Sequence, residues 1–183
     1  MSGHSPAGPL MREHRVIERM IAVLARQLDS IDTDGSVDPD TIDTVTDFIR
    51  WYADRCHHGK EEDILFQRLA SKELDSALAG AMADLIEDHA RGRALTRRLS
   101  EGNKRFAVGD TSALSEIGLA VQELVAFYPA HIEKEDHHFF KPCLEYFTDA
   151  EKTQMLKDFD DFDRALIHAK YLATVEVLER VAG

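Results

Sequence analysis

Residues 55–66 read Arg-Cys-His-His-Gly-Lys-Glu-Glu-Asp-Ile-Leu-Phe and contain two overlapping His-x-x-x-Glu pairs, His57 with Glu61 and His58 with Glu62. Residues four apart share one face of a helix, so the two pairs point in different directions and only one of them can face inward. The apolar residues in helical phase with the second pair are Trp51, Leu65 and Leu69, and the residues in phase with the first pair are Arg50 and Arg68. We therefore predict that His58 and Glu62 point into the core. A glutamate is almost never buried without a partner, so this burial needs an explanation.

A second copy of the pattern lies further along the chain, in residues 131–139, His-Ile-Glu-Lys-Glu-Asp-His-His-Phe. Here His131 and Glu135 form the pair, and it again falls on the apolar stripe of its segment. Each pair also has a lone histidine on an earlier amphipathic segment, since His14 lies 44 residues before His58 and His89 lies 42 residues before His131. The chain therefore reads as two similar halves.

The hydrophobic pattern predicts helices and no strands. The expected helices cover 10–28, 39–70, 76–108, 110–141 and 148–181, with a loop over 30–38. Asp38-Pro39 and the sequence Thr148-Asp-Ala-Glu151 are typical helix starts, and Pro142 is expected to end the fourth helix.

Short connections between long helices favour antiparallel neighbours. We therefore predict an all-α fold, an up-down-up-down four-helix bundle over 10–147 with an additional C-terminal helix over 148–183 packed on it. Residues 1–9 are expected to form a disordered tail.

Composition narrows the range of functions. The chain has 183 residues, 44% of them hydrophobic, and a formal net charge of −12. This balance suits one folded domain, and the acidic charge without a basic stripe argues against nucleic acid or an anionic membrane as a partner. Neither a signal peptide nor a long apolar run is present in the sequence, so we expect a cytoplasmic protein.

The inward-facing histidines and glutamates together form a candidate metal site. The predicted ligands are His14, His58, Glu62, His89, His131 and Glu135. Antiparallel packing brings them to comparable heights in the bundle, which is how helical bundles build metal centres from facing helices. Imidazole and carboxylate ligands without a thiolate favour iron, with zinc or manganese also possible. Two carboxylates from different helices can each bridge two metal ions, and six protein ligands leave coordination positions open for a small ligand.

The order His, His-x-x-x-Glu, His, His-x-x-x-Glu resembles the hemerythrin-like or HHE cation-binding domains, over roughly residues 10–140. The resemblance implies a non-haem di-iron centre, bridged by an oxo or hydroxo group, in a four-helix bundle. It also implies that the six predicted residues are the iron ligands and that Glu62 and Glu135 are the bridging carboxylates. One departure from the oxygen-carrying hemerythrins is Arg93, which stands where they have a second histidine one turn after the third-helix ligand.

Four further side chains are candidates for positions beside the ligands. They are Arg93, His138, Tyr52 and Tyr128. If Arg93 faces the open coordination positions, its guanidinium is expected to favour an anion such as peroxide there, because an opposite charge in a partly dry site strengthens binding. The alternative, which the sequence favours, is an arginine that extends out of the bundle into solvent.

Two functions of different class follow from the same ligands. The first is a binding protein that takes up dioxygen, nitric oxide or peroxide for sensing, storage or iron and oxygen homeostasis. The second is a di-iron oxidoreductase that removes peroxide or other reactive oxygen or nitrogen species. A metal-free interaction bundle would leave the buried carboxylates unexplained. The imidazole-rich ligand set supplies less negative charge for high-valent iron than a carboxylate-rich one, so we favour binding.

Overall fold

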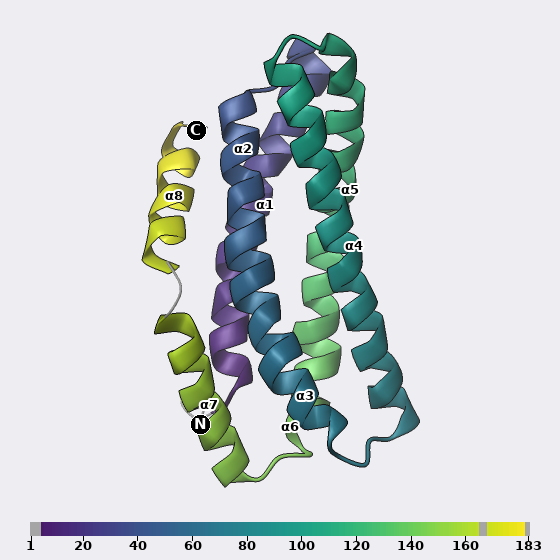
Figure 1. Ribbon diagram of the computed structural model, residues 1–183, viewed down its shortest axis with the longest axis vertical. Helices are drawn as coiled ribbons and strands as arrows, with labels where there is room; N and C mark the ends of the chain where they lie inside the picture. Colours follow the sequence, from purple (N-terminus) through teal and green to yellow (C-terminus); the bar gives the residue numbers. More distant parts are fainter. Residues whose placement is uncertain (1–4, 165–167, 182–183) are drawn as a thin grey trace.

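The computed structural model describes residues 5–164 and 168–181, and within them the fold is entirely helical (Figure 1). The helices are α1 (Ala7–Asp34), α2 (Pro39–Phe48), η1 (Ile49–His58), η2 (Glu61–Phe66), α3 (Gln67–Ala70), α4 (Ser76–Ala107), η3 (Thr111–Ala113), α5 (Leu114–Glu133), η4 (Lys134–Phe139), α6 (Phe140–Leu144), α7 (Asp149–Arg164) and α8 (His168–Val181). The segments from α2 to α3 form one continuous helical run, as do those from α5 to α6. Together with α1 and α4 they form the predicted four-helix bundle.

The four long helices close into a ring, because α1 packs on α5, α5 on α4, α4 on α2 and η1, and η1 on α1. Their ends follow the expected capping chemistry. The Asp38 carboxylate accepts from the Asp40 amide at the start of α2, and the Thr148 and Glu151 side chains cap each other's amides at the start of α7. The predicted second and third helices are confirmed.

Helix α1 is longer than the sequence pattern indicated. It begins at Ala7, because Pro9 lies in the first turn, where no amide hydrogen bond is lost. It also continues into the expected loop as far as Asp34 and is capped by Gly35, whose φ of 61° is left-handed, so that the loop covers only 35–38. Of the tail expected to be disordered, residues 1–4 lie outside the described residues. Pro142 does not end its helix either, since α6 runs to Leu144.

Three segments are wound as π-helices, namely η1, η2 and η4. A π-helix closes its hydrogen bonds five residues apart, which widens each turn and shifts the direction of every later side chain relative to an α-helix. Such segments are rare and frequently lie at functional sites. Here η1 and η2 contain the histidines and glutamates of the first pattern, and η4 contains Glu135 of the second, whose His131 lies on α5.

The apolar core is divided into two clusters, with the predicted site between them. On α1, Leu10 belongs to one cluster and Ile17 to the other, and the buried His14 lies between them. On α4, His89 lies in the same way between Leu85 and Leu95. Apolar packing above and below therefore holds a polar layer away from water.

The additional C-terminal helix is present, and the structure describes it as α7 and α8. Both α7 and α8 run along the outside of the bundle beside α1 and the α2 run (Figure 1). Helix α8 is held by ion pairs and hydrogen bonds such as Arg19 to Glu179 at 2.6 Å and the Tyr171 hydroxyl to Asp47 at 2.6 Å. The predicted single helix ran through 165–167, which lie outside the described residues.

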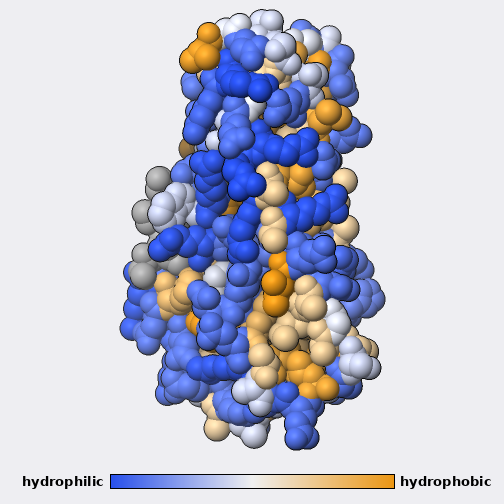
Figure 2. Space-filling view, turned by 45° about the vertical axis from the view of Figure 1, so that its right-hand side comes forward, coloured by the Kyte–Doolittle hydropathy of each residue, from blue (hydrophilic) through white to orange (hydrophobic). Residues whose placement is uncertain are grey.

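The face seen in Figure 2 is mostly hydrophilic, with a vertical strip of apolar side chains that broadens towards the lower end and smaller apolar patches elsewhere. Among the described residues, no helix is both long and apolar enough to cross a bilayer.

Candidate metal centre

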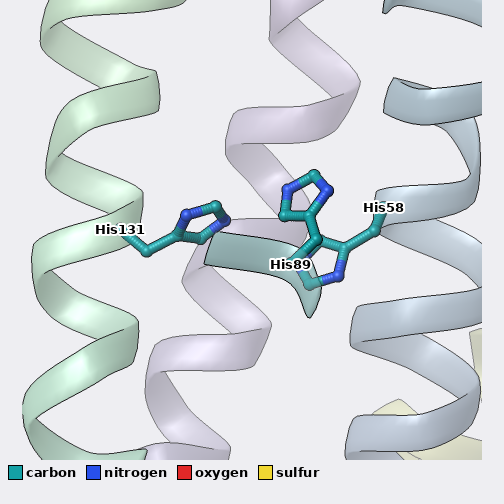
Figure 3. A group of neighbouring side chains, drawn as sticks. All are labelled: His58, His89 and His131. Carbon is teal, nitrogen blue, oxygen red and sulfur yellow. The ribbon is translucent and has the colours of Figure 1, made fainter. Parts of the chain in front are cut away.

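Two groups of potential metal ligands meet in the polar layer. The first consists of His58, His89 and His131, whose imidazoles approach one another from three different helical runs (Figure 3). The ring centroids of His58 and His89 are 3.9 Å apart, and those of His89 and His131 are 5.0 Å apart. Within this group the ligand atoms all lie within 4.8 Å of one another, which is close enough to surround one ion.

The second group consists of His14, His57, Glu61 and Glu135, with the same 4.8 Å limit between its ligand atoms. The Nε2 atoms of His14 and His57 face each other at 2.9 Å. All four side chains are nearly or fully buried, and both carboxylates are 0% exposed. This group supplies nitrogen and oxygen atoms to a second position.

Each carboxylate reaches imidazoles of both groups. Glu61 Oε1 is 3.6 Å from His57 Nε2 and Glu61 Oε2 is 3.5 Å from His89 Nε2. Glu135 Oε2 is 3.0 Å from His14 Nε2, while Glu135 Oε1 is 3.3 Å from His131 Nε2. Both carboxylates therefore lie where a ligand shared between two metal ions would lie.

The carboxylate oxygens of Glu61 and Glu135 make no hydrogen bond to the described residues, and the same holds for Nε2 of His89 and His131. A buried ion or polar atom without a partner costs several kcal/mol, and a native core rarely contains so many together. Metal ions would satisfy these inward-facing atoms at once. The donor atoms present therefore fit a pair of cations of the kind that prefers nitrogen and oxygen.

The outward Nδ1 atom of every imidazole has a carboxylate nearby. Three of these contacts are hydrogen bonds, His14 to Asp136 at 2.7 Å, His57 to Glu13 at 2.9 Å and His89 to Glu62 at 2.7 Å. The other two are 3.6 Å contacts, His58 to Asp54 and His131 to Asp88. A carboxylate that accepts from Nδ1 fixes the tautomer in which Nε2 offers its lone pair to a metal. The outer side chains are thus arranged to orient the inner ones.

The crowding of charge shows in the pKa values. Burial, followed by repulsion from Glu135, raises the pKa of Glu61 well above its ordinary range. Burial and the neighbouring His14 lower the pKa of His57 to about 4. For His14 itself, burial lowers the pKa, but the neighbouring carboxylates of Asp136 and Glu135 outweigh it and raise the pKa to about 10. A cation in the centre would relieve the repulsion between the carboxylates.

The prediction that Glu62 is the inward carboxylate is wrong. The Glu62 side chain is 27% exposed and binds His89 Nδ1 from outside the centre, whereas Glu61 is fully buried between the imidazoles. His58 is buried as predicted, but His57 is buried as well. Consecutive histidines both face inward because the wide turn of η1 changes the α-helical phase from which the prediction was made. Trp51, which anchored that phase, is 46% exposed.

The remaining predicted ligands lie where the sequence placed them. His14, His89, His131 and Glu135 are all buried and contribute to the two groups. Sequence reasoning missed His57 and Glu61, although a signal was present. His57 lies 43 residues after His14, which matches the 42-residue interval between His89 and His131 better than the 44-residue interval to His58.

Arg93 does not offer a free charge to the centre. Its guanidinium donates to Asp54 Oδ1 at 2.7 Å and to Glu62 Oε1 at 2.6 Å, so two carboxylates already neutralise it. The same Glu62 oxygen contacts His89 Nδ1. Arg93 therefore holds the carboxylate that orients a predicted ligand, and the expected anion-binding role loses its basis.

Replacing Arg93 with leucine is expected to weaken metal retention by no more than about tenfold, the lower end for loss of an outer hydrogen-bond partner, because Glu62 keeps its contact with His89. Azide affinity should stay nearly unchanged, since little free charge is removed. Chelator competition and azide titration measure the two effects separately. Strongly weakened azide binding with unchanged metal retention would return Arg93 to its originally expected role.

The other three candidates lie at different distances from the site. His138 is exposed on η4, whose Glu135 and Asp136 reach His14 instead. Tyr52 is buried against Phe48, with ring centroids 4.9 Å apart, in the apolar cluster that contains Ile17. Tyr128 is buried too and lines a cavity of about 80 Å³ shared with His58 and Arg93. Only Tyr128 adjoins one of the two ligand groups in this way.

Comparison with known proteins agrees with the geometry. No curated protein and no solved structure matches the chain significantly. The family model of the hemerythrin HHE cation binding domain matches residues 6–143, which include every side chain of the two ligand groups. The chain belongs to the hemerythrin HHE cation-binding domain family.

Proposed function

We propose that the chain holds two iron ions in this centre and uses them to bind dioxygen or a related small ligand, such as nitric oxide or peroxide. The bound state would then serve sensing, storage or iron and oxygen homeostasis. The observation that carries the proposal is the placement of Glu61 and Glu135, fully buried, unsatisfied and each reaching imidazoles of both groups.

The two halves of the centre differ in what the chain supplies. His58, His89 and His131 would hold one ion, and His14 with His57 the other, while the two carboxylates reach both. Bound iron supplies a change of oxidation state and coordination positions that protein atoms do not fill. Because the second half has one imidazole fewer, it leaves more room for an added ligand. Iron is favoured over structural zinc since the donors are imidazoles and carboxylates without thiolates.

The chain's own residues orient and shield the ligands. The carboxylates of Glu13, Glu62 and Asp136 hold the rings in position, and the apolar clusters on both sides keep water away. Arg93, the strongest candidate for steering an anion, is already neutralised. This supports binding over an oxidoreductase.

Metal analysis of protein prepared with iron and without oxygen tests the proposal. We expect about two iron ions per chain, because bundle sites of facing histidines and carboxylates hold pairs of ions. Optical spectra should then change on exposure to dioxygen and return when it is removed. Absence of bound metal, or zinc that iron cannot replace, would refute the iron proposal. Sustained consumption of peroxide would instead favour the di-iron oxidoreductase.

A further inference from the structure

A buried lysine connects the metal centre to α7. Lys60 is 0% exposed, and its ammonium group is ion-paired with Glu13 of α1 and, at 2.8 Å, with Asp163 of α7. A buried ammonium is costly unless it is paired and hydrogen-bonded, so both carboxylates are needed at this point.

The chain of contacts continues into the centre. Glu13 Oε1 accepts from Lys60, and Glu13 Oε2 is 2.9 Å from Nδ1 of His57. On the other side of the ring, His57 Nε2 faces His14 and Glu61. Asp163 is therefore joined to a proposed metal ligand through two charged side chains.

The packing of α7 at this point is close. A side-chain carbon at Gly59 would lie 2.8 Å from the Phe162 ring, so the absence of a side chain there lets α7 pack this closely on the bundle. Phe159 of the same helix is buried, and the Lys60 ammonium lies 5.9 Å from the centre of its ring. Helix α7 lies outside the family match of 6–143, so this contact belongs to the part that the chain adds to the domain.

We propose that Lys60 and Asp163 are positioning residues for His57, through which docking of α7 and metal retention at the His14 and His57 half are coupled. This coupling rests on the proposed function, and α7 is the helix whose docking would respond to metal binding. A metal ligand at Nε2 requires the hydrogen of His57 on Nδ1, so Glu13 must accept it as a carboxylate. Lys60 stabilises that carboxylate, and Asp163 stabilises the charge of Lys60.

Coupling between two sites is reciprocal. Loss of Asp163 should loosen the metal, and loss of the metal should loosen α7. The charge of Asp163 also determines in which direction the midpoint potential of the metal should change. Removing one negative charge near the centre favours the more reduced metal, so the midpoint potential should rise.

The test compares Asp163→Asn with Asp158→Asn in the full chain. Asp158 also anchors α7, but its ion pair is with Arg68 rather than with a residue that contacts His57. We expect iron transfer to a chelator to be about tenfold faster in Asp163→Asn, the lower end for an outer partner of a ligand, and near the native rate in Asp158→Asn. Asp163→Glu should restore slow transfer in part, and the midpoint potential should rise only in Asp163→Asn.

Amide hydrogen exchange measures the opposite effect, that of the metal on the docking of α7. Metal loading should slow amide exchange within 149–164 in the native chain and in Asp158→Asn, and by much less in Asp163→Asn. Asp163→Ser repeats the comparison should the asparagine variant not fold. Equal effects of the two aspartate variants, or exchange in α7 that ignores the metal, would overturn the proposal. The exchange experiment is repeated with zinc or manganese in place of iron. A chain that binds one of these ions but not iron would refute the iron assignment and still show whether α7 and the metal are coupled.

Discussion

Replacing Glu61 with glutamine is expected to lower the iron content far below that of the native chain at saturating iron, whereas replacing Glu62 with glutamine leaves it unchanged. Glu61 is fully buried and its oxygens lie 3.6 Å from His57 Nε2 and 3.5 Å from His89 Nε2, so an amide there removes a charged ligand from both halves. Among the proposed ligands, Glu62 contacts His89, at its outer nitrogen, and loss of such a partner weakens affinity by about 10- to 100-fold, which excess iron overcomes.

The pair is well matched because the two glutamates are neighbours on the same helix. Iron per chain is measured after equilibration with excess ferrous iron and removal of unbound metal, and circular dichroism confirms that both variants fold. Loss of iron in Glu62→Gln with retention in Glu61→Gln would show that the outer glutamate is the ligand. Equal retention in both would mean that Glu135 alone joins the two ions.

The contrast between these glutamates also shows where sequence reasoning succeeds. The helices, the bundle and the burial of five of the six predicted ligands follow from the apolar period. His14 and His89, for example, lie on α1 and α4, where that period holds throughout.

The period fails across η1 and η2, where hydrogen bonds five residues apart rotate later side chains out of the expected phase. The composition of 49–66 does not indicate a π-helix. The prediction that Glu62 faces inward could therefore not be corrected from periodicity. Comparing the intervals between histidines depends on no helical phase, and it favours His57. Long-range partners such as Asp163 for Lys60 are equally hidden, because they depend on how α7 returns to the bundle.

Removing the metal is expected to lower the melting temperature of the native chain by about 8 to 16 °C. A ligand at 1,000 times its Kd stabilises the folded state by about 4 kcal/mol, and for a chain of this size each kcal/mol shifts the transition by about 2 to 4 °C. Glu61 and Glu135 account for the physical cause, because without a cation two fully buried carboxylates with no hydrogen bond to the described residues remain close together.

In the metal-free protein, Glu61→Gln is expected to leave the melting temperature unchanged or to raise it. Burial and repulsion from Glu135 raise the pKa of Glu61 well above its ordinary range, which means that its charge opposes folding. A neutral amide removes that repulsion, so the metal-free variant should melt at or above the temperature of the metal-free native chain. Scanning calorimetry of both proteins, after chelation and after reloading, measures all four states. If chelation left the native melting temperature unchanged, or if Glu61→Gln lowered it in the metal-free state, the buried carboxylates would have to be satisfied by something other than a metal.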